Sequence, residues 1–131
     1  MIVEIYPKKE LLINGKSGLY NLESLELKRN QIVNLNGFQF LNGLIILILS
    51  NNNFTKIKSI NNMNNLTFLD ICTNKLRNLD KISLWILLNI KIIIADNNIL
   101  KKNNLKKYAT LSYISFENNK ITNFNQIEEI K

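Results

Sequence analysis

Apolar and polar residues follow one repeating pattern through most of this chain. Residues 22–32 fit the spacing L-x-x-L-x-L-x-x-N-x-I, in which x is any residue. The pattern recurs four more times, and its five asparagines are Asn30, Asn52, Asn74, Asn98 and Asn119. Successive asparagines are 22, 22, 24 and 21 positions apart. Five copies of one pattern at nearly constant spacing indicate a repeat architecture.

Each copy predicts a short strand followed by a bend. Leu25 and Leu27 are two positions apart, so in a strand their side chains point to the same side and enter the core. Apolar residues then follow at every third position, as at Leu35, Phe38 and Leu41, which suits short 3₁₀ turns. We therefore expect stacked strands on one side of a solenoid and irregular helical turns on the other.

The register divides the chain into six units within a single domain, residues 1–131. Val3 and Ile5 lie 22 positions before Leu25 and Leu27, so the first unit is a degenerate repeat. Lys8 stands in it where an asparagine is expected, as is usual for a terminal capping unit. The predicted units are residues 1–21, 22–43, 44–65, 66–89, 90–110 and 111–131. The unit 66–89 has two extra residues near Trp85. We expect the Trp85 side chain to lie in the core.

These motifs resemble the leucine-rich-repeat family over essentially the whole chain. The 22-residue period is similar to that of the subclass that includes the regulatory subunit of protein phosphatase-1 and the spliceosomal leucine-rich A-prime protein. The resemblance implies an α/β fold: a right-handed solenoid forming a short arc, with a parallel concave β-sheet of about six strands. Its convex side would carry 3₁₀ or irregular helical segments. The motif is specific for a fold and says little about function.

The repeated asparagine has a structural explanation. The chain bends away from the strand at this position, so its backbone groups lose their partners in the sheet. A buried amide side chain can both donate to and accept from such groups in adjacent coils. We therefore interpret Asn30, Asn52, Asn74, Asn98 and Asn119 as a structural ladder rather than as ligand-binding residues.

The outward positions of the strands carry more apolar residues than the repeat requires. Read across the repeats, they place six apolar side chains together: Ile46, Ile48, Phe68, Ile92, Ile94 and Tyr113. Acidic residues, among them Asp70 and Asp96, surround this group. A contiguous apolar patch with a polar rim is typical of a protein interface. Biased composition is the alternative, because the chain contains 21 isoleucines and 24 asparagines.

The net charge of +7 raises the question of an acidic partner, such as nucleic acid. The concave face is poorly suited to binding phosphate groups, because its outward positions hold five carboxylates. The basic residues there are Lys28 and its neighbour Arg29. A basic patch falls instead on the returning side of the fifth unit. Its residues are Lys101, Lys102, Lys106 and Lys107. We favour a solvated convex surface there, with contact to RNA or to an acidic protein as the alternative.

Residues needed for most catalytic chemistry are missing from the sequence. There is no histidine, which removes histidine-activated nucleophiles and the commonest zinc ligand. Cys72 is the single cysteine, so it cannot form an intrachain disulfide. We therefore expect no enzymatic activity, no cofactor and no metal site. A single cysteine fits a reducing compartment, and no apolar run approaches the length of a membrane span.

Three hypotheses for function follow. The first is a protein–protein interaction module that holds a partner on its concave face. The second is a ribonucleoprotein component that uses the basic lysines. The third is a self-associating structural solenoid. We expect a cytoplasmic location and no membrane contact. A nuclear location, or secretion after removal of a leader, stays open.

Overall fold

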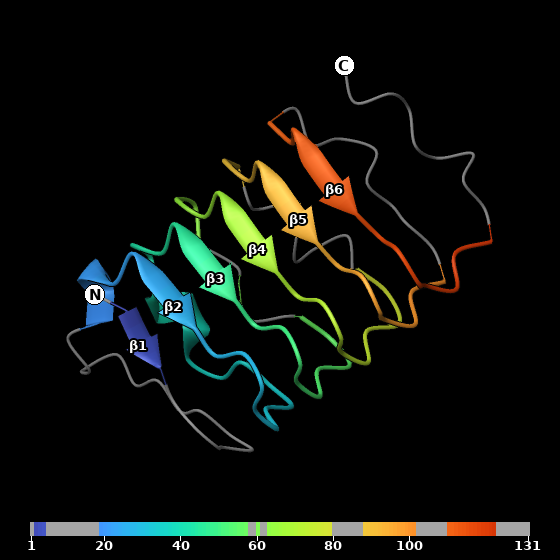
Figure 1. Ribbon diagram of the computed structural model, residues 1–131. Coiled ribbons are helices and arrows are strands. Elements are labelled where there is room, and N and C mark those ends of the chain that lie inside the picture. The colour runs from blue at the N-terminus through green and yellow to red at the C-terminus, as the bar shows by residue number, and fades with distance from the viewer. Residues whose placement is uncertain are drawn as a thin grey trace.

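Six short parallel strands form one sheet in a computed structural model of the chain. The structure describes residues 2–4, 19–57, 60, 63–79, 88–101 and 110–122. The strands lie side by side in chain order, from β1 at one end to β6 at the other (Figure 1). They are β1 (Ile2–Glu4), β2 (Ser24–Glu26), β3 (Ile46–Ile48), β4 (Phe68–Asp70), β5 (Ile92–Ile94) and β6 (Tyr113–Ser115). The predicted solenoid with a parallel sheet of about six strands is therefore confirmed.

The strand register follows the sequence repeat residue by residue. Ser24 pairs with Ile46, and Ile46 pairs with Phe68, each step being one 22-residue turn. The longer fourth unit leaves the register unchanged, because Phe68 still pairs with Ile92 across 24 positions. Variation in repeat length is therefore absorbed away from the sheet.

The core lies behind the sheet, between the strands and the returning segments. Each strand from β2 to β5 contributes a central leucine or isoleucine that is at most 2% exposed. The apolar residues of the returning segments close the core from the other side. Those described as buried include Leu35, Phe38, Leu41, Ile57, Ile60, Met63 and Leu79. Trp85 lies outside the described residues.

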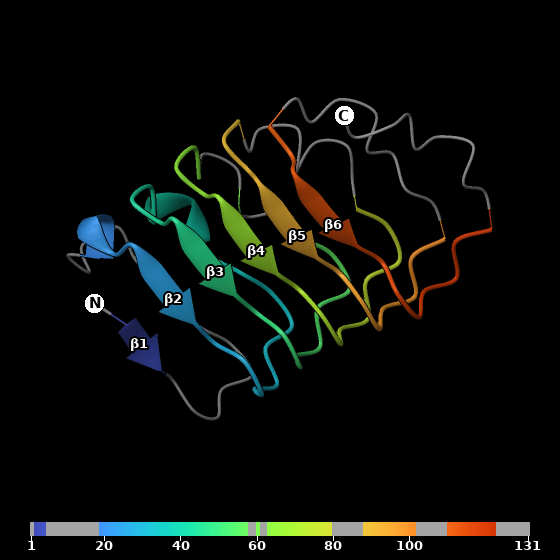
Figure 2. The same ribbon diagram turned by 45° about the horizontal axis from the view of Figure 1, so that its top comes forward.

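Turns of 3₁₀ helix stand among the segments that return behind the sheet. One, η1, spans Leu19–Asn21 and precedes β2. Another, η2 (Phe38–Phe40), lies behind the strands and buries Phe38 (Figure 2). Gly37 opens η2 with a φ of 87°, a left-handed conformation that glycine adopts without steric cost. These short turns agree with the three-residue spacing of apolar residues in the sequence.

Candidate functional site

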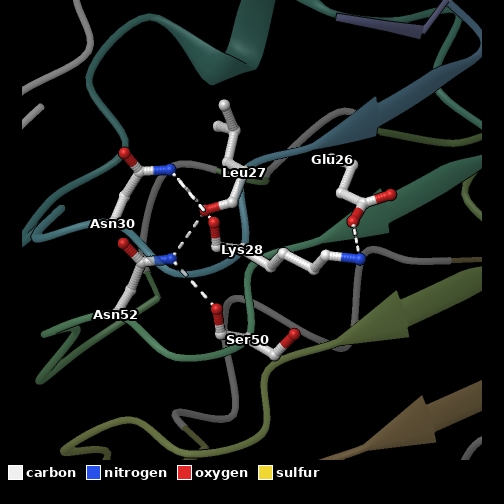
Figure 3. A network of polar contacts seen from close by, with 6 residues as sticks. All are labelled: Glu26, Leu27, Lys28, Asn30, Ser50 and Asn52. Atoms are coloured by element: carbon white, nitrogen blue, oxygen red, sulfur yellow. Dashed lines mark hydrogen bonds and ion pairs between the residues drawn. The ribbon is translucent and has the colours of Figure 1, made fainter. Parts of the chain in front are cut away.

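The asparagine ladder holds neighbouring repeats together immediately after each strand. Asn52 accepts a hydrogen bond at Oδ1 from the backbone N–H of Ile32, one repeat earlier, at 3.0 Å. Its Nδ2 donates back to the carbonyl of Leu27 at 2.8 Å. Asn30 also donates to the Leu27 carbonyl, at 3.1 Å, so this one oxygen receives two amide groups (Figure 3).

The same arrangement recurs along the described part of the solenoid. Asn74, Asn98 and Asn119 accept from the backbone N–H groups of Phe54, Leu76 and Leu100 at 3.0 to 3.1 Å. They donate to backbone carbonyls of the preceding repeat, those of Leu49, Ile71 and Ala95. These side chains therefore satisfy backbone groups at the bend, where no strand partner is available.

The residue before each ladder asparagine adopts a left-handed backbone conformation. These residues are Arg29, Asn51, Thr73, Asn97 and Asn118, with φ between 50° and 58°. Asparagine tolerates this conformation better than most residues, whereas a β-branched residue such as Thr73 is strained in it. This feature was not predicted from the sequence. Its only signal was an asparagine before the ladder position in three of the five repeats.

The solvent side of the strands, which we call the sheet face, carries the predicted apolar residues. Ile46, Phe68, Ile92 and Tyr113 occupy matching positions on β3 to β6, so they form one row across four neighbouring strands. Ile46 is 37% exposed and Tyr113 is 54% exposed, and the two between them are half-buried. We refer to this row together with Ile48 and Ile94 as the apolar patch.

Three carboxylates follow the apolar patch at the carboxyl ends of the last strands. They belong to Asp70, Asp96 and Glu117, and we call them the acidic sector. Asp96 Oδ1 accepts from the Ser115 hydroxyl at 2.5 Å and from the Glu117 N–H at 2.7 Å. Asp70 Oδ1 accepts from the Cys72 N–H at 2.9 Å. Two of the three carboxylates are thus fixed by hydrogen bonds within the sheet.

Cys72 lies between the two aspartates of this sector. Partial burial, a hydrogen bond to the Asp70 side chain and the charge of Asp70 together raise the pKa of its thiol to about 12 from an ordinary value of 9.0. The negative charge of Asp96 acts in the same direction. The thiol is therefore protonated at neutral pH and a poor nucleophile.

The first strands of the sheet carry a different charge pattern. Glu26 on β2 forms an ion pair with Lys28, which follows the same strand (Figure 3). The acidic charge at this end of the sheet face therefore has a basic partner within its own repeat. Among the nine outward residues of β4 to β6 and their carboxyl ends there is no lysine or arginine.

Two small residues in the outward columns are buried rather than exposed. Ser50 and Ser115 fall at positions that alternate with the core residues, but they are only 6% and 9% exposed. The Ser115 hydroxyl donates a hydrogen bond to Asp96 Oδ1. The alternating pattern of a strand predicts the side of the sheet on which a residue lies, but it does not predict how far neighbouring side chains bury that residue.

A second set of side chains links the repeats at the opposite ends of the strands. Asn65 donates to the Asn42 carbonyl at 3.0 Å, and Asn89 donates to the Asn64 carbonyl at 2.7 Å. Thr110 takes the equivalent place in the next repeat and donates to the Ile90 carbonyl at 2.8 Å. The sequence reasoning missed these residues, although a polar residue does precede the first motif leucine there.

A shallow groove of about 620 Å³ follows this amino-terminal edge of the strands. Glu23, Ile45, Thr67 and Lys91 are among its lining residues. Its mixed charge and open shape give no defined ligand chemistry.

The remaining predicted features are only partly covered by the structure. Lys101 is exposed, whereas Lys102, Lys106 and Lys107 lie outside the described residues. Within the described ranges, no group of three or more histidine, cysteine or acidic residues is arranged to hold a metal ion. No helix in the part of the chain that the structure describes is long and apolar enough to cross a membrane.

Comparison with known proteins adds no relative to this picture. No protein-family model matches the sequence, and no curated protein matches it.

Proposed function

We propose that this chain is a solenoid of the leucine-rich-repeat type that binds another protein through its sheet face. The observation that carries the proposal is the apolar row from Ile46 to Tyr113, which crosses four neighbouring strands on the solvent side. The repeat places no apolar requirement on these positions, since the core is built from the residues that alternate with them. Contiguous apolar surface of this kind marks interaction sites on folded proteins.

The role we propose is non-catalytic. The outward residues of the sheet face are isoleucines, aromatic residues and carboxylates, and the sequence contains no histidine. The thiol of Cys72 has a raised pKa, which favours the unreactive protonated form. We further propose that the protein acts in the cytoplasm, because the single cysteine suits a reducing compartment.

The test is recovery of partners from the source cell with variants of the sheet face. Phe68→Asp and Ile92→Asp each place a charge in the apolar row and should abolish recovery of a specific partner. Phe40→Asp is the matched control, because Phe40 is 41% exposed and belongs to η2, away from the sheet face. Thermal unfolding of all three variants checks that they fold. If the two sheet-face variants recover the same partner as the unchanged protein, the proposal is wrong.

The ribonucleoprotein and self-association hypotheses remain predictions with their own measurements. RNA binding would require the lysines around Lys101 and would weaken steeply with salt. Self-association would appear as a rise of molar mass with concentration in light scattering. The apolar patch favours a protein partner over RNA because its neighbours are carboxylates.

A further inference from the structure

On β4 to β6 the outward side chains of the sheet face change from apolar to acidic along the direction of the strands. Phe68, Ile92 and Tyr113 begin β4, β5 and β6. Asp70 ends β4, and Asp96 and Glu117 follow the ends of the next two strands. Asp70 pairs with Ile48 and Ile94, so it lies in the row between the first residues of the strands and the carboxylates of Asp96 and Glu117. A ligand lying across the strands would therefore meet apolar side chains along one side, and Asp96 and Glu117 along the other, with Asp70 between them.

We propose that the apolar patch and the acidic sector together bind a basic amphipathic helix of a partner protein, lying across β3 to β6. This inference rests on the proposed protein-binding function and adds the chemistry of the partner. The helix would set apolar side chains against the patch and lysine or arginine side chains against Asp70, Asp96 and Glu117.

Charge complementarity is the first argument for this occupant. The acidic sector holds three of the nine outward residues of β4 to β6 and their carboxyl ends, and none of the other six is basic. At the other end of the face, by contrast, Glu26 is already paired with Lys28. The Asp70 and Asp96 carboxylates are also held in place, by the N–H groups of Cys72 and Glu117. Fixed carboxylates lose little side-chain freedom when they pair with a cation.

The spacing of the strands is the second argument. Neighbouring strands lie about 4.8 Å apart, and one turn of an α-helix rises 5.4 Å. A helix across the sheet thus offers about one turn to each strand, and about 10 residues reach from β3 to β6. An extended segment presents same-side residues about 6.8 Å apart, which does not match the strand spacing. The row Ile46–Phe68–Ile92–Tyr113 therefore suits residues three or four apart on one helix face.

The net charge of the protein opposes the binding of a basic helix, so such binding would distinguish a specific local site from general electrostatic attraction. A protein of net charge +7 attracts acidic ligands in general and repels basic ones. Preference for a basic helix must therefore come from a local site, and it runs against the field of the whole molecule.

The experiment uses three fluorescent synthetic helices of 14 residues with one shared leucine stripe. Their polar faces carry lysine, glutamine or glutamate, and anisotropy measures their binding to the full chain at low and moderate salt. We expect the lysine helix to bind most tightly and the glutamate helix most weakly. The triple variant Asp70→Asn, Asp96→Asn, Glu117→Gln should weaken the lysine helix about tenfold and leave the glutamine helix nearly unchanged.

The substitutions are chosen to separate charge from structure. Asparagine at 70 and 96 keeps an Oδ1 acceptor for the Cys72 and Glu117 N–H groups, so the sheet should be preserved. Glu23→Gln removes one carboxylate at the opposite edge of the strands and should not change binding of the lysine helix. A variant with unchanged thermal unfolding but lost preference for lysine supports the acidic sector as the cause.

The outcomes also separate this inference from the proposed function. If Phe68→Asp and Ile92→Asp abolish partner recovery while the glutamate helix binds as well as the lysine helix, protein binding stands and the basic helix is wrong. If the lysine helix binds Phe68→Asp and the triple variant as tightly as it binds the unchanged protein, its site lies elsewhere and the inference is overturned. If the unchanged protein forms dimers that bury the sheet face and exclude all three helices, a second copy is the occupant and the inference also fails.

Discussion

Asn52 donates a hydrogen bond to the backbone carbonyl of Leu27, 25 positions earlier in the chain, at 2.8 Å. The same side chain accepts from the Ile32 N–H and also donates to the carbonyls of Leu49 and Ser50 within its own repeat. A single amide thus joins backbone groups of two successive repeats. The stability of the fold should therefore depend on this amide as well as on the packing of the apolar core.

Asn52→Ala should lower the free energy of unfolding by about 2–4 kcal/mol, because it leaves buried backbone groups without partners. Urea denaturation followed by circular dichroism measures the change. Asn78→Ala is the control, because Asn78 is exposed and such changes cost under about 0.5 kcal/mol. Equal effects of the two substitutions would remove the ladder as a source of stability.

Thr73→Asn should stabilise the protein by about 1 kcal/mol. Thr73 has a φ of 50°, and a β-branched side chain is strained in this left-handed region. Asn51, Asn97 and Asn118 occupy the equivalent places, so the substitution introduces the residue that the repeat uses elsewhere. The reverse change, Asn51→Thr, should destabilise by a similar amount. A destabilised Thr73→Asn would show that a contact of the threonine outweighs its backbone strain.

Asn89→Ala should destabilise less than Asn52→Ala, by about 0.5–1.5 kcal/mol. Asn89 bonds the Asn64 carbonyl at 2.7 Å, but it is exposed and water can replace it. Urea denaturation curves of Asn89→Ala and Asn52→Ala, measured under the same conditions, compare the stabilisation from the two sets of inter-repeat hydrogen bonds. A larger effect at Asn89 would mean that the amino-terminal edge of the strands controls the stacking.

The thiol of Cys72 should react slowly with iodoacetamide at pH 8, because its pKa is raised to about 12. Asp70→Asn removes a negative charge that raises this pKa, so it should speed the reaction. The unfolded chain, measured in urea, gives the rate of an ordinary thiol. A rate in the folded protein equal to that of the unfolded chain would contradict the raised pKa.

The same pKa shift predicts a dependence of stability on pH. Well below pH 9 the thiol is protonated in both the folded and the unfolded chain, so it causes no change of the free energy of unfolding with pH. Between pH 9 and about 12 the unfolded chain loses this proton while the folded chain keeps it, so stability falls as pH rises. Thermal unfolding across this range should show a smaller fall for Cys72→Ser than for the unchanged protein.

The strand register could be predicted because the motif is local and periodic. Leu25 and Leu27 fix which residues face inward, and five asparagines fix the phase, so Ile46, Phe68 and Ile92 were placed in one row correctly. The strain at Thr73 was not predicted, because backbone angles depend on the bend, and the repeats do not all carry the same residue at this position. The burial of Ser50 depends on neighbouring side chains, which the pattern of one repeat does not contain.

The contacts of the asparagine ladder have the same form at the four described junctions, those made by Asn52, Asn74, Asn98 and Asn119. Each ladder asparagine after Asn30 meets the preceding repeat through one backbone N–H and one carbonyl, whichever residues supply them. A whole repeat can therefore be gained or lost by duplication or deletion without changing the chemistry of any junction. The number of strands, and with it the width of the sheet face, can therefore change in evolution in steps of one whole repeat.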